Sequence, residues 1–211
     1  MSDRVSIAED GADAARSALE RCVGSGGVAA FPADGLYGLA CDPLNAPAIE
    51  RIQALKGRDD HKPSAVMYFA PLAMRELLAA LGPRTRDAVA SLLPGPVTLV
   101  VANPQRRYPL ACRQDPERLG VRLIEGPLSG AMTPVFQTSA NLSGAPPANR
   151  FEDVPAAIRD AVDLAIDGGE LTGAPSTVVD ITRIDADGGW TILREGGLPE
   201  RRLEELLGPA A

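Results

Sequence analysis

Two cationic side chains flank a glycine where a predicted helix gives way to a turn. In ALKGRDDHKP, Lys56 and Arg58 stand on either side of Gly57, and Lys62 precedes Pro63. Arginine offers a planar fork of donors to phosphate or carboxylate oxygens, lysine offers a mobile point charge, and glycine lets the backbone approach a ligand. The spacing therefore predicts an anion clamp, with a solvated basic surface stretch as the alternative interpretation.

A second polar cluster follows an apolar run typical of a strand. The sequence TSANLSG, residues 138–144, combines hydroxyls, an amide and a glycine. Ser139 and Asn141 offer donors and acceptors at the carboxyl end of a strand, where ligands bind in open α/β sheets. Local turn hydrogen bonds are the alternative, and the same two interpretations apply to Ser176 in APSTVVD.

Two arginines stand in or beside apolar runs. Arg122 lies in the middle of GVRLI, where a buried charge needs a partner or a ligand because leaving it unpaired is costly. Arg194 follows WTIL and precedes two glycines after Glu195, which predicts an arginine at a strand tip, within reach of a phosphate. A surface ion pair with Glu195 or a charge on the sheet edge is the alternative for Arg194.

Helix signals predict how some of these residues are positioned. Asp10 is the expected N-cap of a helix that ends at Gly24, where glycine stops the periodic apolar pattern. Asn45 and Pro47 form a helix-start pairing, because the amide caps free N–H groups and proline suits the first turn. We expect the second helix to deliver Lys56 at its end.

Apolar runs bounded by turn residues predict the remaining elements. Strands are expected at 27–31, 37–41, 65–69, 97–102, 120–124, 134–137, 164–166, 178–182 and 190–193. Helices are expected at 71–81, 84–93, 151–161 and 199–207. Because strands alternate with helices but the chain closes with a hairpin across DADGG, the sequence predicts an α/β fold, with helices flanking a mixed parallel and antiparallel sheet.

Composition limits the classes of protein this chain can belong to. The 211 residues include 21 basic and 28 acidic side chains, a net charge of −7. A chain of this length can bury a core without disulfides, and its acidic surface opposes general nucleic-acid binding. The N-terminus is acidic where a signal peptide is apolar, and no apolar run is long enough to span a membrane. We therefore expect a cytoplasmic protein without membrane contact.

Several familiar chemistries have no signature here. The sequence contains no GxxxxGK[ST], GxGxxG, HExxH or GxSxG motif, and its three cysteines have no CxxC spacing. His61, the one histidine, is expected in an exposed loop, while Cys22 and Cys41 are expected in the core. Covalent catalysis and a protein-held metal are not expected. The segment GPVTL is interpreted as a structural strand.

Taken together, these segments resemble one family. The chain carries, in the order and approximate spacing of the Sua5/YciO/YrdC family of threonylcarbamoyl-AMP synthases, the segments FPADGLYGLACDPLNAPAIERIQALKGRDDHKP, LLPGPVTLVV, LGVRLI, TSANLSG, PSTVVDIT and ILREG, over about 25–197. The resemblance implies one YrdC-like domain over 1–211, similar to the short form, with a twisted sheet and a concave cavity. It also implies a nucleotidyltransferase that joins L-threonine, bicarbonate and ATP into threonylcarbamoyl-AMP and pyrophosphate, for N6-threonylcarbamoyl modification of adenosine 37 in tRNA.

The resemblance also implies a role for each matching residue. Lys56 and Arg58 would be catalytic, holding the triphosphate and neutralising charge as pyrophosphate leaves. The ATP site would also include Lys62, Asn141, Asn149 and Arg194. The threonine site would comprise Arg122, Ser139 and Ser176, with the arginine pairing with the carboxylate.

The implied chemistry agrees with the residue types. Adenylyl transfer depends mainly on positioning and electrostatic stabilisation, which suits a site rich in Lys, Arg, Ser and Asn and poor in His. Mg²⁺ would arrive on the ATP phosphates. A downstream tRNA threonylcarbamoyl transferase would receive the product, and a weak direct contact with tRNA or another RNA is a further implied partner.

Three positions depart from the family pattern and keep other functions open. The family usually reads PT[DE]T where this chain has Pro32, Ala33, Asp34 and Gly35, and Met67 stands where some members have histidine. Two hydroxyls of the amino-acid pocket are therefore missing, which weakens threonine binding or relaxes selectivity for its hydroxyl. One alternative is a paralogue that makes a different carbamoyl-adenylate. The other is a non-catalytic RNA-binding module with a positive hollow in an acidic body.

Overall fold

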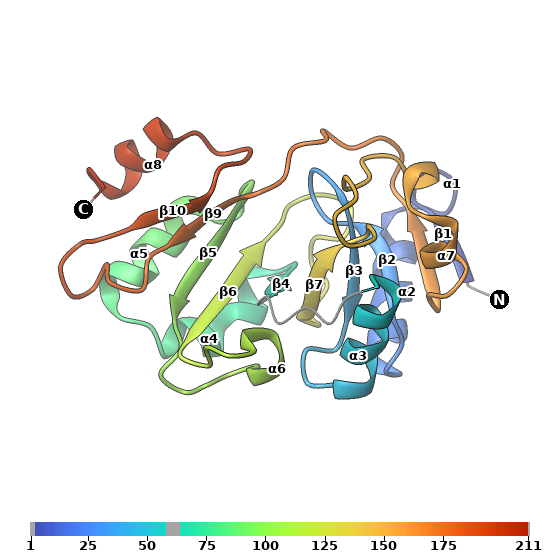
Figure 1. Cartoon of the computed structure of the whole chain (residues 1–211), viewed down its shortest axis with the longest axis horizontal. Coiled ribbons are helices and arrows are strands. Elements are labelled where there is room, and N and C mark those ends of the chain that lie inside the picture. Colours follow the sequence, from blue (N-terminus) through green and yellow to red (C-terminus); the bar gives the residue numbers. More distant parts are fainter. Residues whose placement is uncertain (1–2, 58–63, 211) are drawn as a thin grey trace.

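One mixed sheet runs the length of the molecule (Figure 1). The computed structural model describes residues 3–57 and 64–210. Within this part of the chain, ten strands form a sheet in the order β1-β8-β2-β3-β7-β4-β6-β5-β9-β10. The strands are β1 (Asp3–Ser6), β2 (Ala29–Pro32), β3 (Tyr37–Cys41), β4 (Ala65–Tyr68), β5 (Val97–Ala102), β6 (Arg118–Leu123), β7 (Val135–Ser139), β8 (Leu164–Asp167), β9 (Thr177–Asp180) and β10 (Thr191–Arg194).

The pairing of the strands confirms the predicted mixed α/β fold. β1 and β2 each pair with β8 in parallel, as do β4 with β6 and β5 with β9. The antiparallel pairs are β2–β3, β3–β7, β4–β7, β5–β6 and β9–β10. Every strand predicted from the sequence is present, with ends shifted by no more than two residues.

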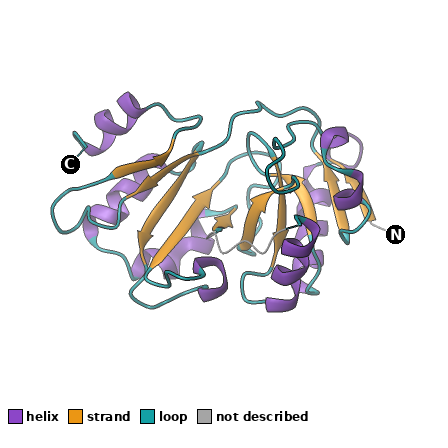
Figure 2. Cartoon of the chain, in the orientation of Figure 1, coloured by secondary structure: helices purple, strands orange, loops and turns teal. Residues whose placement is uncertain are grey.

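Helices lie on both sides of the sheet (Figure 2). They are α1 (Ile7–Asp10), α2 (Ala12–Gly24), α3 (Ala46–Leu55), α4 (Arg75–Ala79), α5 (Pro83–Leu92), α6 (Pro109–Cys112), α7 (Ala156–Arg159) and α8 (Glu200–Leu207), with 3-10 turns η1 (Pro71–Met74) and η2 (Phe151–Asp153). Asn45 caps α3 as predicted, because its side-chain oxygen accepts from the N–H of Ala48 at 3.1 Å. Lys56 directly follows α3, which also confirms its predicted place.

The predicted cap of the first helix is wrong. Asp10 is the last residue of α1, and Gly11 precedes α2. The Asp10 carboxylate accepts from the N–H of Ser6 at 2.8 Å, while the Ser6 hydroxyl accepts from the N–H of Glu9. These two bonds satisfy free donors at the start of α1 rather than α2.

Two predicted helices are interrupted, and three short elements were not predicted. The segments 71–81 and 151–161 each divide into a 3-10 turn and a short α-helix. Pro155 separates η2 from α7 because it restricts the backbone of the residue before it to extended conformations. The elements absent from the prediction are β1, α1 and α6. β1 lacked a signal because its charged sequence, DRVS, is exposed or only half-buried.

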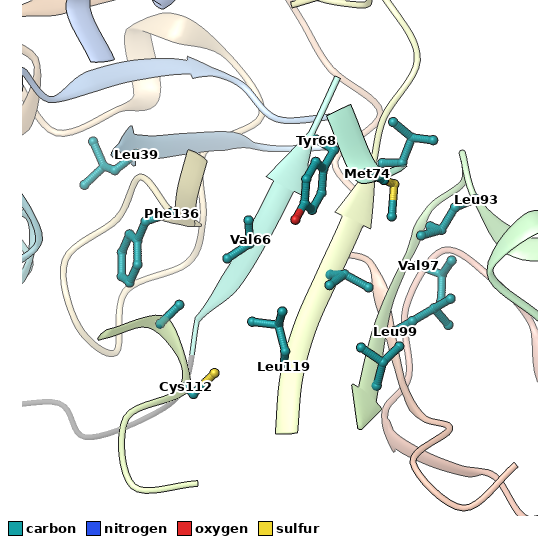
Figure 3. Packing of buried hydrophobic residues seen from close by; sticks show 14 of the residues in the cluster. Leu39, Val66, Tyr68, Met74, Leu93, Val97, Leu99, Cys112, Leu119 and Phe136 are labelled. Carbon is teal, nitrogen blue, oxygen red and sulfur yellow. The ribbon is translucent and has the colours of Figure 1, made fainter. Parts of the chain in front are cut away.

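The main apolar core covers one face of the sheet (Figure 3). Alternate residues of the central strands, including Val66, Leu99, Leu119 and Phe136, point to this face and are almost fully buried. Side chains from α3, α4, α5 and α8 pack against them. Because strand residues alternate between faces, the neighbours of these residues must point to the opposite side.

The opposite face is covered only in part. A second core joins Ala15, Leu19 and Val23 of α2 to Phe31 and Met67 of the sheet. This helix packs near β1, β2, β3 and β8. None of the helices in the described part of the chain is long and apolar enough to cross a membrane.

Between β8 and β9 the chain crosses from one end of the sheet to the other (Figure 1). β8 adjoins the edge strand β1, whereas β9 adjoins the opposite edge strand β10. Residues 168–176, hereafter the crossover segment, make this connection. The Tyr37 hydroxyl holds its beginning by accepting from the N–H of Gly168 at 2.9 Å and donating to the carbonyl of Gly169 at 2.8 Å.

Candidate active site

A cavity of about 780 Å³ lies between the sheet and the crossover segment. This volume is in the range of small-molecule sites. The polar residues in its lining include Ser64, Thr98, Asp115, Arg118, Arg122, Gln137, Thr138, Ser139, Ser176 and Arg194. Four residues that the sequence predicts as ligand-binding, Arg122, Ser139, Ser176 and Arg194, are therefore brought together from β6, β7, the crossover segment and β10.

Strand alternation explains why these side chains share the cavity. On two strands the residues that line it are two positions apart: Thr98 and Val100 on β5, and Arg118, Gly120 and Arg122 on β6; at the end of β7 three consecutive residues, 137–139, line it. The residues between them on β5 and β6, Leu99, Leu119 and Val121, belong to the main core on the other face. The polar residues Thr98 and Arg122 in these apolar strands thus face a cavity rather than the packed core.

Arg122 is the most deeply buried cation of the lining. Its side chain pairs with Asp34, with 3.1 Å between Nη2 and Oδ2, and Nη1 lies 3.4 Å from the carbonyl of Ala33. Its Nε is buried and has no acceptor among the described residues. Burial lowers the pKa of Arg122 to about 10, Asp34 offsets part of this, and the nearby charge of Arg194 lowers it further. Arg122 therefore remains charged at neutral pH, and it lines the cavity.

The turn between β2 and β3 brings Asp34 to this arginine. Asp34 adopts a left-handed backbone with φ of 77°, which aspartate tolerates better than most residues. The next residue, Gly35, touches the crossover segment: Gly173 donates to its carbonyl at 2.9 Å. A Cβ on Gly35 would lie 2.2 Å from the carbonyl oxygen of Ala174. The close approach of these two backbones therefore requires glycine.

A chain of hydrogen bonds joins β5, the crossover segment and β10. Arg194 donates through Nη2 to the carbonyl of Ser176 at 2.7 Å and to its hydroxyl at 3.2 Å. The Ser176 hydroxyl is also 2.8 Å from the Thr98 hydroxyl. Burial lowers the pKa of Arg194. The end of the crossover segment is thus fixed between a threonine and an arginine.

Lys56 lies against the loop that follows β7. Its Nζ donates to the carbonyl of Ser139, lies 3.5 Å from the Ser139 hydroxyl, and is 3.0 Å and 3.3 Å from the carbonyl and side-chain oxygens of Asn141. The carbonyl of Lys56 accepts from Ser143 at 2.9 Å. The Lys56 side chain is 4% exposed. The ammonium therefore holds this loop beside the cavity, and Ser139 is its link to the lining.

Other residues that the sequence predicts for the site do not line the cavity or lie outside the described residues. The Asn141 amide donates to carbonyls within its own loop, and Asn149 binds Leu171 of the crossover segment through its side chain and backbone. Neither asparagine is in the cavity lining. Arg58 and Lys62, together with His61, lie outside the described residues. Their roles stay predictions.

Some residues of the site were not predicted. Thr98 was interpreted as part of a structural strand, although a threonine between Val97 and Leu99 is the same signal that identified Arg122. Gln137 lacked any signal beyond its strand position. Arg118 pairs with Asp180 through Nη2, and its Nε lies 3.7 Å from Oδ2 of Asp115. No sequence pattern predicts that these three residues meet.

The prediction that Cys22 and Cys41 belong to the core is confirmed, although Cys22 is only half-buried. Cys41 is fully buried, Cys112 is buried beside the cavity, and Cys22 packs partly exposed on the second core. All three are free thiols. Burial raises the pKa of each one, to about 11 for Cys22 and about 12 for Cys41. These thiols are therefore protonated at neutral pH, which opposes nucleophilic chemistry.

Comparison with known proteins identifies the family. The model of the Sua5/YciO/YrdC family, which carries the description "Telomere recombination", matches residues 21–196. The chain belongs to this family. The fold and the cavity described above are therefore those of a Sua5/YciO/YrdC member, as the motifs predicted.

Two named relatives indicate how much of each chain is shared. The chain is 32% identical to the threonylcarbamoyl-AMP synthase of Pyrococcus abyssi over 195 residues, which are 87% of this chain and 54% of the relative. It is 36% identical to the threonylcarbamoyl-AMP synthase of Chromohalobacter salexigens over 163 residues, 74% of this chain and 86% of the relative. The chain thus spans about half of the first Sua5/YciO/YrdC relative and most of the second.

Solved structures of the family share the fold. The structure of P. abyssi Sua5 complexed with L-threonine matches with a TM-score of 0.80 and 27% identity, over 99% of this chain and 61% of that chain. E. coli YciO matches with a TM-score of 0.79 and 23% identity, over 96% and 99% of the two chains. At that identity the likeness to YciO shows the fold alone.

Proposed function

We propose that this protein is an L-threonylcarbamoyladenylate synthase, a nucleotidyltransferase that forms threonylcarbamoyl-AMP and pyrophosphate from L-threonine, bicarbonate and ATP. The observation that carries the proposal is the cavity itself, which brings together Arg122, Ser176 and Arg194 from separate elements of the fold. The names of the relatives and the threonine complex of P. abyssi Sua5 support the same activity.

In this proposal Arg122 binds the carboxylate of the amino acid. The guanidinium lines the cavity, and a largely buried arginine binds a carboxylate more strongly than an exposed one because less water screens its charge. Ser139 and Ser176 line the same cavity and offer hydroxyl donors to the substrate. Their positions agree with the threonine site that the family resemblance implies.

The nucleotide lies, in this proposal, toward Arg194 and the loop of Ser139 and Asn141. Arg194 supplies a positive charge, and Lys56 holds the loop in place through the loop's oxygen atoms. Arg58 and Lys62 complete the phosphate site by family resemblance. Mg²⁺ is proposed as a companion of the ATP phosphates, which bind it through oxygen. The described residues contain no cluster of three or more His, Cys, Asp or Glu side chains that could hold a metal.

The chemistry requires little acid or base from the protein. Threonine and bicarbonate form a carbamate with loss of water, and a carbamate oxygen then bonds to the α-phosphorus as the bond to the bridging oxygen of pyrophosphate breaks. Negative charge accumulates on phosphate oxygens in this step, so fixed cations lower its barrier. In this proposal Arg194 supplies such a cation, Lys56 holds the loop of Ser139 and Asn141 beside the cavity, and Arg122 keeps the amino acid in position.

Cavity charge supports anionic substrates. Of the three arginines in the described lining, Arg118 and Arg122 are paired with aspartates, whereas Arg194 has no carboxylate partner among the described residues. The charge of Arg194 attracts anions such as ATP and bicarbonate. A direct RNA contact remains a secondary proposal, and strong salt-dependent RNA binding without ATP turnover would favour a binding module over the enzyme.

A second candidate differs only in the amino acid. Ala33 and Gly35 line the cavity and contribute no side-chain hydroxyl there. A substrate hydroxyl near these residues therefore has fewer partners, which weakens discrimination between threonine and other amines. A paralogue that makes another carbamoyl-adenylate is the function that this observation favours second.

Partners and location complete the proposal. The unstable carbamoyl-adenylate must pass to an acceptor, which we propose is a tRNA threonylcarbamoyl transferase acting in N6-threonylcarbamoyladenosine formation. The three free thiols support a reducing compartment, the cytoplasm.

Pyrophosphate release from ATP tests the proposed function. The assay supplies bicarbonate and Mg²⁺, with L-threonine, L-serine or no amino acid. We expect release that depends on L-threonine, and a loss of about a hundredfold or more in kcat/KM for Arg122→Ala, because the loss of a buried charged hydrogen bond is costly. Arg86→Ala, on the exposed surface of α5, is the matched control and should retain activity.

Each other result has a distinct meaning. Equal release with L-serine would support the substrate-shifted paralogue. ATP binding without release under any condition would contradict the synthase.

A further inference from the structure

Thr98 places a hydroxyl between the sheet and the crossover segment. Its side chain is 8% exposed and points to the cavity face of β5, between Val97 and Leu99, which belong to the main core. The Thr98 hydroxyl lies 2.8 Å from the hydroxyl of Ser176. A buried hydroxyl is costly without a hydrogen bond, so this contact accounts for a polar residue within an apolar strand.

Counting protons shows what the pair offers to a ligand. Thr98 and Ser176 have two hydroxyl protons between them, and their mutual hydrogen bond uses one. Arg194 donates to the Ser176 oxygen at 3.2 Å and so uses an acceptor position, not a proton. One hydroxyl proton therefore remains, and because both residues line the cavity it is available to an acceptor there.

The surroundings of this free proton select an anionic acceptor. Arg194 is bonded to Ser176 on one side, and Arg122 lies near enough for the charge of Arg194 to act on it. Thr98 lies beside Arg122 in the sheet, because β5 and β6 are antiparallel and Leu99 pairs with Val121, the residue before Arg122. Two cations and one hydroxyl donor together suit the oxygens of a carboxylate.

We propose that Thr98 is a positioning residue of the amino-acid site. Its hydroxyl fixes the Ser176 side chain so that Ser176 accepts from Arg194 and one hydroxyl proton faces the substrate carboxylate held by Arg122. The proposal rests on the proposed function for the identity of the substrate. The hydrogen-bond arrangement itself is a property of the unliganded protein.

Replacing Thr98 by valine and by serine separates the hydroxyl from the shape of the side chain. Thr98→Val keeps the shape and removes the hydroxyl, whereas Thr98→Ser keeps the hydroxyl. We expect Thr98→Val to raise KM for L-threonine about fivefold or more, the effect of one lost hydrogen bond, with a smaller change in kcat and in KM for ATP. Thr98→Ser should restore KM to within about twofold of the unmodified protein.

A remote threonine provides the matched control. Thr85, on α5, is 3% exposed and donates its hydroxyl to Asp185. Thr85→Val also removes a buried hydroxyl, and it should lower thermal stability without changing KM for L-threonine. An unchanged KM in Thr98→Val, or an equal rise in Thr98→Ser, would overturn the positioning role.

A second measurement does not depend on turnover. Side-chain N–H signals of ¹⁵N-arginine-labelled protein, assigned for Arg194 with the variant Arg194→Lys, report the Ser176–Arg194 contact directly. Thr98→Val should shift the Arg194 signal and speed its hydrogen exchange, while Thr98→Ser and Thr85→Val should not. If the unmodified protein releases no pyrophosphate, the proposed function fails, and this signal alone decides the role of Thr98. An Arg194 signal indifferent to Thr98→Val would refute it.

Discussion

Asp34 forms the one carboxylate contact that the described residues offer to Arg122, across 3.1 Å. The arginine is 7% exposed at its side chain and the aspartate 35%, so the pair lies at the boundary between core and cavity. Asp34 thus offsets part of the cost of burying Arg122. This counter-ion keeps a cation at the cavity wall, as the proposed binding of an anionic substrate requires.

Asp34→Asn tests this relationship with little change of shape. Asparagine also tolerates the left-handed backbone at this position, so the effect should come from the lost charge. We expect a loss of about 1–3 kcal/mol in the free energy of unfolding, because Arg122 is left without its counter-ion. L-Threonine should restore more thermal stability to this variant than to the unmodified protein. Equal Tm values for the two unliganded proteins would contradict the role of Asp34.

Gly35→Ala tests the contact between the β2–β3 turn and the crossover segment. The added Cβ would meet the Ala174 carbonyl at 2.2 Å, so one of the two backbones must move, at a cost of about 1–3 kcal/mol. Ser176 lies close after Ala174, so we also expect a higher KM for L-threonine. Gly24→Ala is the control, because no atom lies within 4 Å of the added Cβ. Calorimetric unfolding and steady-state kinetics of both variants check the prediction, and an unaltered Gly35→Ala protein would contradict it.

The sequence predicted the central strands because their signals are local. Asn45 before Pro47 identifies the start of α3, and the apolar run around Leu99 identifies β5. The need of Arg122 for a partner could be predicted from physics alone, since a charge within a buried strand is costly when unpaired, and Asp34 is a partner that the structure shows. Thr98 carries a weaker form of the same signal, because a neutral hydroxyl is cheaper to bury than a charge.

Other features depend on contacts between distant residues. The sequence of β1 has the pattern of an exposed segment. The strand forms because it pairs in parallel with β8, where Val5 lies beside Ile166. The pairing of Asp34 with Arg122 joins residues 88 positions apart. The resemblance implies that Asn149 binds ATP, which stays a prediction. The structure shows that its side chain and backbone form hydrogen bonds with Leu171 of the crossover segment. Such relationships require the folded chain, because no local pattern encodes which segments meet.

Lys56→Met tests whether the ammonium holds the loop of residues 138–144. Methionine keeps much of the volume but removes every donor, which leaves the carbonyls of Ser139 and Asn141 without this partner. We expect the free energy of unfolding to fall by about 1–3 kcal/mol and kcat/KM for ATP to fall by about a hundredfold or more. Arg86→Met, which removes an exposed cation from α5, should change neither. Full activity in Lys56→Met would show that neither the charge nor the loop contact is needed.

Thiol reactivity provides a prediction about pH. Burial raises the pKa of the half-buried Cys22 to about 11, so at pH 8 it has about a hundredfold fewer thiolates than a thiol with a pKa of 9. The folded protein should therefore react slowly with a disulfide reagent at pH 8 and faster as the pH approaches 11. Because the folded state keeps a proton that the unfolded state releases, the free energy of unfolding should fall as the pH rises from about 9 to 11. The variant Cys22→Ser should weaken this fall, since it removes one of the three thiols that contribute to it. Reaction rates of Cys22, followed by mass spectrometry of the labelled peptide, check the prediction, and labelling at pH 8 as fast as in the unfolded chain would contradict it.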